Sequence, residues 1–232
     1  MIRRPPRSTR KESSAASDVY KRQAMAYATT CCTVVALDKN GAPLRPALMW
    51  MDVRADKEAE AVLETGDERL ILNGNGQGPV SAEWMIPKAL WLKRNEPRIF
   101  DDAVTICEYQ DYITMRLTGE RCASLNNVGL RWHYANRAGG WASGIVEKLG
   151  MPDLLEKWPS RVAAPGEVVG NLSAAAAAEL GLSTRTKLVQ GGADALIGMI
   201  VVFNFDNKMG ILLYKDIDDT NKLRNNFIIM FN

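Results

Sequence analysis

Between residues 24 and 200, short apolar runs alternate with segments in which apolar residues recur at helical spacing. Runs of four to eight residues rich in β-branched side chains predict strands, and a recurrence every three to four residues predicts helices. The predicted strands are 31–38, 45–52 and 105–109, and the predicted helices are 56–64, 87–95, 111–117 and 173–180. Segment 187–200 follows as a strand, a glycine turn and a helix. Alternating strands and helices predict an α/β fold, with a mixed or parallel sheet covered by helices.

Turn and capping residues support these boundaries. Lys39-Asn40-Gly41 predicts a hairpin turn between the first two strands, because Asn and Gly tolerate a positive φ. Gly119 is placed to end the third helix, and Ser173 to cap the start of the fourth. No internal repeat of 20–50 residues is visible.

The two ends of the chain differ in composition from this middle part. Residues 1–23 are rich in Arg, Lys, Pro and Ser and have little apolar periodicity, so we expect them to be disordered. They resemble translated sequencing adapter more than a basic arm for nucleic acid. Residues 201–232 contain no alanine and are crowded with Asn, Asp, Lys, Ile and Phe. We interpret them as a chimeric or frameshifted tail, with an edge hairpin of 209–214 and 225–231 as the alternative.

Composition narrows the function. The 232 residues are 47% hydrophobic with a formal net charge of +2, so neither nucleic acid nor a membrane surface is expected as the main partner. No apolar run approaches the roughly 18 residues of a membrane-spanning helix, and the N-terminus lacks the apolar core of a secretory signal. Four cysteines without CxxC spacing favour reduced, mostly buried thiols in a cytoplasmic protein, and no metal site is predicted. His133, the only histidine, has no neighbouring nucleophile motif.

The segment from Leu188 to Ala195 carries the most informative chemistry. An apolar strand ends in Gly191 and Gly192, and Asp194 follows at the start of a helix. Ligands gather at strand ends in α/β sheets, and glycines allow them to approach the backbone. Asp194 therefore has two interpretations, a general base that accepts a proton from a substrate hydroxyl or a helix N-cap.

Three further stretches have both a functional and a structural interpretation. Trp50, Asp52 and Arg54 could contact a sugar, or they could be a core Trp beside a surface ion pair. The glycine-rich run 74–78 lacks the Lys and Ser/Thr of a phosphate-binding loop and is predicted to be a flexible loop. Polar residues in 107–132 suit either a polyol pocket or caps and turns.

Taken together and in order, these stretches resemble the FGGY carbohydrate kinases, most closely the ribulokinase branch. The matching segments are TTCCTVVALDKNGAPLRPALMWMDVRAD, SAEWMIPKALWLKRNEP, EYQDYITMRLTG, SLNNVGLRWHY with Gly140-Trp141, and KLVQGGADALIG. The resemblance implies an actin-like ATPase, ribonuclease-H-like fold, of which this chain would be an incomplete first lobe. It also implies transfer of the ATP γ-phosphate, with Mg²⁺, to a terminal hydroxyl of a pentulose or polyol.

Site residues follow from the same resemblance. Asp194 takes the place of the catalytic base, Cys31 and Arg131 the place of sugar-contacting residues, and Asp52 and Asn127 are weaker matches. Gly191 and Gly192 fall at the cofactor-binding segment. A homodimer is one possible state of the full-length parent protein.

The sequence departs from the family at both ends. The opening D-x-G-T-type phosphate loop and the whole second lobe have no counterpart here, so we expect this polypeptide alone to be inactive. The alternatives are a non-catalytic sugar-binding module and a kinase of another FGGY substrate such as xylulose. Met-His in place of Cys31-Cys32 would have favoured xylulose.

Overall fold

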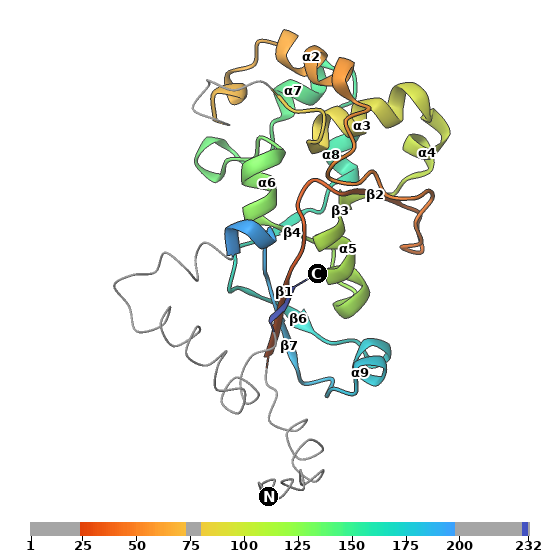
Figure 1. Ribbon diagram of the computed structural model, residues 1–232, viewed down its shortest axis with the longest axis vertical. Helices are drawn as coiled ribbons and strands as arrows, with labels where there is room; N and C mark the ends of the chain where they lie inside the picture. The colour runs from red at the N-terminus through yellow and green to blue at the C-terminus, as the bar shows by residue number, and fades with distance from the viewer. Residues whose placement is uncertain (1–23, 73–79, 198–228, 232) are drawn as a thin grey trace, which may run out of the picture.

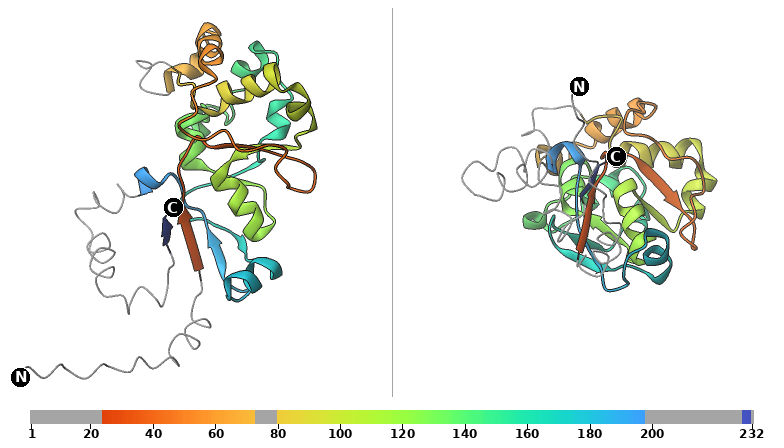
Figure 2. Two further views of the ribbon diagram at one scale, coloured as in Figure 1. Left: turned by 45° about the vertical axis from the view of Figure 1, so that its right-hand side comes forward. Right: turned by 60° about the horizontal axis from the view of Figure 1, so that its bottom comes forward.

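The computed structural model describes residues 24–72, 80–197 and 229–231 (Figure 1). A small sheet built from β1, β6 and β7 lies at one end of the molecule, and most helices gather at the other. Helix α5 lies between the two, and the segment after β1 rises from the sheet into the helical part (Figure 2). The site described below lies where these two parts meet.

This sheet also includes β8, and its four strands lie in the order β6-β7-β1-β8. Strand β1 is parallel to β7 and β8, whereas β6 is antiparallel to β7. Helix α9 and helix α5 pack against this sheet through a small apolar cluster that includes Met25, Tyr27, Leu172, Ala177 and Leu188. The strands are β1 (Ala24–Ala28), β6 (Val168–Asn171), β7 (Lys187–Val189) and β8 (Ile229–Phe231).

Two further pairs of strands belong to the helical part. Strand β2 (Val34–Leu37) is antiparallel to β3 (Thr105–Glu108), and all four residues of each strand are buried. Strand β4 (Cys122–Ser124) is parallel to β5 (Arg161–Ala163). Both pairs confirm the mixed α/β class that the alternation of strands and helices predicted.

The turn after β2 confirms one prediction and corrects another. Gly41 has a φ of +75°, and the Asp38 carboxylate accepts hydrogen bonds from the backbone N–H groups of Asn40 and Ala42. The predicted partner strand at 45–52 is wrong, because only isolated bridges to β2 form there. Pro43 and Pro46 lack the N–H group that a continuous ladder needs.

The four predicted helices are all present, and their caps explain their limits. Helix α5 ends at Gly119, whose φ is +84°, and the Ser173 hydroxyl accepts a hydrogen bond from the Ala176 N–H at the start of α9. The helices are α2 (Asp56–Glu64), α3 (Met85–Asn95), α4 (Pro97–Asp102), α5 (Tyr109–Thr118), α6 (Leu125–Arg131), α7 (Ser143–Lys148), α8 (Leu154–Lys157) and α9 (Ala174–Leu180).

A group of stacked aromatic rings fills the core of the helical part. Trp158 lies with its ring centroid 5.4 Å from that of Trp132 and 4.9 Å from that of Trp141. Tyr134 packs edge-on against Trp141 at 4.7 Å. These rings join α6 to the segments around α7 and α8.

Several predictions fall outside the described residues. They concern 1–23, the glycine-rich run 74–78, and most of 201–232, from which only strand β8 is described beside β1. The boundaries proposed at residues 23 and 200 therefore stay predictions. None of the helices within 24–72 and 80–197 has the length and apolar character needed to cross a lipid bilayer.

Candidate functional site

A pocket of about 390 Å³ opens where the sheet meets the helical part. It is formed by segments far apart in the chain: the residues after β1, the loop near Trp50, the residue before Trp84, the end of α6, and the start of the helix after β7. Its lining residues are Thr30, Cys31, Cys32, Trp50, Glu83, Arg131 and Asp194. Cys31, Arg131 and Asp194, all predicted site residues, therefore face one cavity.

Backbone pairing fixes Asp194 beside the end of β1. The Thr29 N–H donates to the Gly192 carbonyl at 3.3 Å, and the Asp194 N–H donates to the Thr29 carbonyl at 2.9 Å. The Asn126 side chain accepts a hydrogen bond from the Ala193 N–H, which ties the same turn to α6. Asp194 is the first residue of a helix described as far as 197, and its carboxylate also accepts the Ala195 N–H at 2.7 Å. The Ala193 carbonyl accepts the Ile197 N–H at 2.9 Å, so Ala193 occupies the N-cap position and Asp194 follows it. The role of Asp194 as a base stays a prediction.

The two glycines before Asp194 are required by internal packing. A Cβ atom on Gly191 would overlap the Tyr27 carbonyl oxygen, and one on Gly192 would lie 2.7 Å from the Asn126 amide oxygen. The space beside both glycines is therefore occupied by the chain itself. Their predicted part in cofactor binding stays a prediction.

Cys31 and Cys32 place two thiols at the pocket. Their sulfur atoms are 3.7 Å apart, and the Cys32 thiol donates toward Cys31. This contact lowers the pKa of the Cys31 thiol, the positive charge of Arg131 lowers it further, and burial opposes both. The pKa of Cys32 is raised by the same contact and by burial. Cys31 is half-buried and Cys32 is buried.

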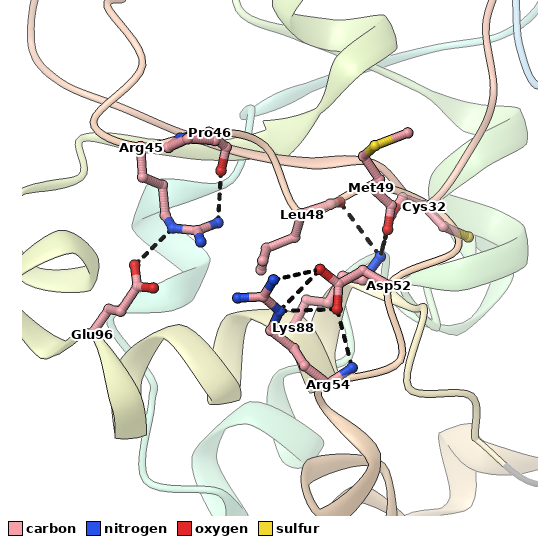
Figure 3. A network of polar contacts seen from close by, with 9 residues as sticks. All are labelled: Cys32, Arg45, Pro46, Leu48, Met49, Asp52, Arg54, Lys88 and Glu96. Atoms are coloured by element: carbon pink, nitrogen blue, oxygen red, sulfur yellow. Dashed lines mark hydrogen bonds and ion pairs between the residues drawn. The ribbon is translucent and has the colours of Figure 1, made fainter.

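Two buried ionisable groups hold the backbone of Cys32, which has a φ of +65°. The Cys32 N–H donates to the Glu108 carboxyl at 3.0 Å, and its carbonyl accepts from the Lys88 ammonium at 2.8 Å. Lys88 also donates to the Met49 carbonyl at 2.6 Å (Figure 3). Because a positive φ is uncommon for a residue with a side chain, these contacts matter for keeping the loop in this shape.

Glu108 is the centre of this buried polar network. Besides Cys32, it accepts hydrogen bonds from the Trp132 indole N–H at 2.7 Å and the Asn127 amide at 2.9 Å. Burial raises the pKa of Glu108 to about 7, against the effect of these three donors, which favour the carboxylate. Burial disfavours the charged form of Lys88 as well, and for this basic group it lowers the pKa.

Asp52 and Asn127, the weaker predictions, lie outside the pocket lining. The Asp52 carboxylate pairs with the Arg54 guanidinium at 2.9 Å (Figure 3). That guanidinium lies 4.8 Å from the centre of the Trp91 ring. Asn127 is buried and its amide donates to Glu108. Both side chains are used within the protein, and their predicted contact with sugar stays a prediction.

The described residues contain no cluster of side chains that marks a metal site. Within them, no three or more His, Cys, Asp or Glu side chains gather in a way that could hold a metal ion. ATP and Mg²⁺ therefore stay predictions for this chain.

The model of the "FGGY family of carbohydrate kinases, N-terminal domain" matches residues 9–201. The chain belongs to the FGGY family of carbohydrate kinases. It is 34% identical over 190 residues to an FGGY carbohydrate kinase domain-containing protein from Danio rerio, covering 75% of this chain and 34% of that protein. It is also 34% identical over 148 residues to a xylulose kinase from Streptomyces coelicolor, covering 60% of this chain and 28% of the relative.

Solved FGGY kinases share the fold. A xylulose kinase from Rhodospirillum rubrum superposes with a TM-score of 0.67 at 28% identity, over 78% of this chain and 37% of the other. The chain thus has the actin-like, ribonuclease-H-like fold of the family, over its N-terminal domain. It spans about a third of the length of the curated relatives it matches.

Sequence reasoning missed the residues that support the pocket. Glu108 was noted only as one polar residue among several, and Lys88 only as part of a motif. A usable signal existed for Lys88, since it lies on α3 among Met85, Ile86, Ala89 and Leu90, all buried. A lysine within an apolar helix face is rarely left without a polar partner.

Proposed function

We propose that residues 24–197 form the sugar-binding part of an ATP-dependent kinase that acts on a ribulose-like pentulose in the cytoplasm. The observation that carries this proposal is the meeting of Cys31, Arg131 and Asp194 on one pocket of about 390 Å³. The three residues lie on segments separated by some 60 residues or more of sequence, and each matched a sugar-site position of the family. A cavity of this size suits a small polyhydroxylated ligand.

The pocket offers the groups that a sugar needs. Trp50 is 42% exposed and presents an apolar ring face, while Arg131 and Glu83 supply a donor and an acceptor for hydroxyl groups. Asp194 accepts the proton of the hydroxyl that becomes phosphorylated, so that the oxygen can act as the nucleophile. When bound, MgATP supplies the phosphoryl group and neutralises charge. This chain's own contribution is to bind and orient the sugar and to hold the base.

Two alternatives differ from this proposal in the sugar or in the chemistry. Xylulose is favoured by the relatives named xylulose kinase, which share 34% and 29% identity with this chain. A pocket that binds sugar without phosphorylating it is the second alternative.

Calorimetric titration of the 232-residue chain with D-ribulose, L-ribulose and D-xylulose tests the proposal. We expect binding of a ribulose, tighter than that of xylulose. Arg131→Gln should weaken it at least about tenfold, since the lost hydrogen bonds are charge-assisted. Arg137→Gln, on an exposed residue of the next short helix, is the matched control. Failure of all three sugars to bind would overturn the proposal, and tighter binding of xylulose would favour the first alternative.

Incubation of the same chain with MgATP and the sugar that it binds distinguishes a kinase from the second alternative, a pocket that binds sugar without phosphorylating it. Formation of sugar phosphate that is lost in Asp194→Asn would contradict the non-catalytic interpretation. Binding without phosphate transfer is the result we expect of this polypeptide alone, in agreement with the inactivity predicted from its sequence.

A further inference from the structure

The two adjacent thiols of the pocket differ in exposure. Both residues line the cavity, but Cys31 is half-buried whereas Cys32 is only 3% exposed. Their sulfur atoms are 3.7 Å apart, compared with about 2.05 Å in a disulfide. Rotation of the two side chains, together with adjustment of the backbone between them, would bring the two sulfur atoms to bonding distance.

The surroundings activate one thiol of the pair. Arg131 lies near Cys31 and stabilises its thiolate, and the Cys32 thiol donates toward the same sulfur. The thiolate is the reactive form of cysteine, so nucleophilic character is concentrated on the sulfur that solvent can reach. Cys107 and Cys122 are buried at 1% and 0% exposure, and burial raises the pKa of both.

The backbone holds the second thiol in place. Cys32 is fixed by Glu108 at its N–H and by Lys88 at its carbonyl, in a conformation with φ of +65°. The Cys32 sulfur therefore stays beside the Cys31 sulfur, so the second step needs no thiol from another molecule. The Cα atoms of neighbouring residues are about 3.8 Å apart, shorter than the roughly 4.4–6.8 Å of ordinary disulfides. A disulfide between them would be strained and easily reduced, which is typical of a reversible bond rather than a structural one.

We propose that Cys31 and Cys32 form a peroxide-sensitive dithiol site that closes reversibly to a disulfide within the pocket. The Cys31 sulfur attacks one oxygen of a hydroperoxide, and the O–O bond breaks. The departing oxygen takes the proton that the Cys31 thiol gives up and leaves as an alcohol, or as water from hydrogen peroxide. The Cys32 sulfur then attacks the sulfenic acid on Cys31. The S–O bond breaks and water leaves with the Cys32 proton. Two thiols lose two electrons in total and the peroxide gains them.

Disulfide formation would change the pocket that we propose for the sugar. It would draw the Cys31 sulfur toward Cys32 and remove the thiolate that faces Arg131. Sugar affinity should then fall at least about tenfold, a consequence that rests on the proposed function. The chemistry at the two sulfur atoms does not rest on it.

Oxidation of the reduced 232-residue chain by hydrogen peroxide, followed by thiol trapping and peptide mass spectrometry, tests the site. We expect the peptide that carries Cys31 and Cys32 to lose two hydrogen atoms at least about tenfold faster than Cys107 or Cys122 is modified. Dithiothreitol should restore it. Because all four cysteines are compared within one molecule, this measurement needs no variant. Equal rates at all four cysteines, or disulfides only between two chains, would overturn the proposal.

Variants assign the steps, with circular dichroism confirming that each one folds. Cys32→Ser should leave a sulfenic acid on Cys31 that dimedone traps, whereas Cys31→Ser should leave Cys32 unoxidised. Arg131→Gln should slow the reaction several-fold and Arg137→Gln should not. Undiminished oxidation of Cys32 in Cys31→Ser would contradict the assignment of the nucleophile.

A parallel titration separates this proposal from the proposed function. If the disulfide forms but the reduced chain binds none of the sugars, the dithiol site stands and the sugar pocket fails. If the reduced chain binds sugar but no disulfide forms, the reverse holds. If both occur, sugar affinity should fall on oxidation and recover on reduction.

Discussion

Lys88 and Glu108 hold the two backbone polar groups of one residue: the ammonium group binds the carbonyl of Cys32 at 2.8 Å, and the carboxyl group accepts its N–H at 3.0 Å. Both side chains are buried, at 0% exposure each. Lys88 comes from α3 and Glu108 from the end of β3, so the pocket loop is attached to the helical part at two independent points. The shape of the loop that presents Cys31 thus depends on residues that do not line the pocket.

Removing the ammonium group tests this attachment. Lys88→Met keeps most of the side-chain volume but leaves the Cys32 and Met49 carbonyls without their charged donor. We expect the free energy of unfolding, measured in urea, to fall by about 3 kcal/mol. Lys93→Met on the same helix removes a partly exposed pair with Asp153 and should cost under about 1 kcal/mol. Equal losses in the two variants would contradict the role given to Lys88.

Glu108 should give stability a distinctive dependence on pH. Its folded-state pKa of about 7 lies above the 4.5 of an unperturbed Glu, so the folded state keeps the proton that the unfolded state releases. Stability should therefore fall as pH rises from about 4.5 to about 7, by up to about 3 kcal/mol. Urea unfolding of the protein and of Glu108→Gln across this range measures the difference. A gap between the two that stays constant with pH would show that Glu108 does not titrate there.

His133 should act with the opposite sign. It is 1% exposed, and burial lowers its pKa from 6.5 to about 4. The unfolded state then binds the proton more readily, so stability should fall as pH drops from about 6.5 to about 4, by up to about 3 kcal/mol. His133→Asn removes the titration, and Asn tolerates the positive φ of 55° found there. Since Glu108 acts with the opposite sign over much of this range, the slope of unfolding free energy against pH should be more negative in this variant than in the unaltered chain. An unchanged slope would refute the assignment.

Gly191 should not tolerate a side chain. In Gly191→Ala the new methyl group would overlap the Tyr27 carbonyl oxygen, which belongs to strand β1. Since backbone atoms have to move, we expect a loss of about 3 kcal/mol or more in urea unfolding. Gly129→Ala is the matched control: it lies in α6, its Cβ would meet nothing within 4 Å, and it should stabilise the chain by up to about 1 kcal/mol. A mild effect at Gly191 would mean that β1 can shift away.

Local signals predicted much of the fold. Helices α2 and α9 were expected at 56–64 and 173–180 and occur at Asp56–Glu64 and Ala174–Leu180, because caps and apolar spacing mark their ends. The strand predicted at 45–52 does not form. The prediction relied on the apolar composition of this segment and gave too little weight to Pro43 and Pro46, which lie just before it and near its start.

The site was predictable to a lesser extent. The sequence predicted three site residues that face one pocket, namely Cys31, Arg131 and Asp194. For Asp52 and Asn127, sequence could not tell a side chain that faces a ligand from one bound by Arg54 or Glu108, because that depends on contacts between distant segments. The same limit applies to Lys88 and Glu108, whose importance comes from a third residue that both of them bind.

The aromatic core has a consequence for how this protein can be observed. All six tryptophans lie between residues 50 and 158, and three of them form the stacked group of Trp132, Trp141 and Trp158. Strands β1, β6 and β7 and helix α9 contain none. Intrinsic indole emission therefore reports on the helical part and, through Trp50, on the pocket, but not on local opening of strands β6 and β7. Amide exchange at Met25 and Leu188 would reveal what fluorescence misses.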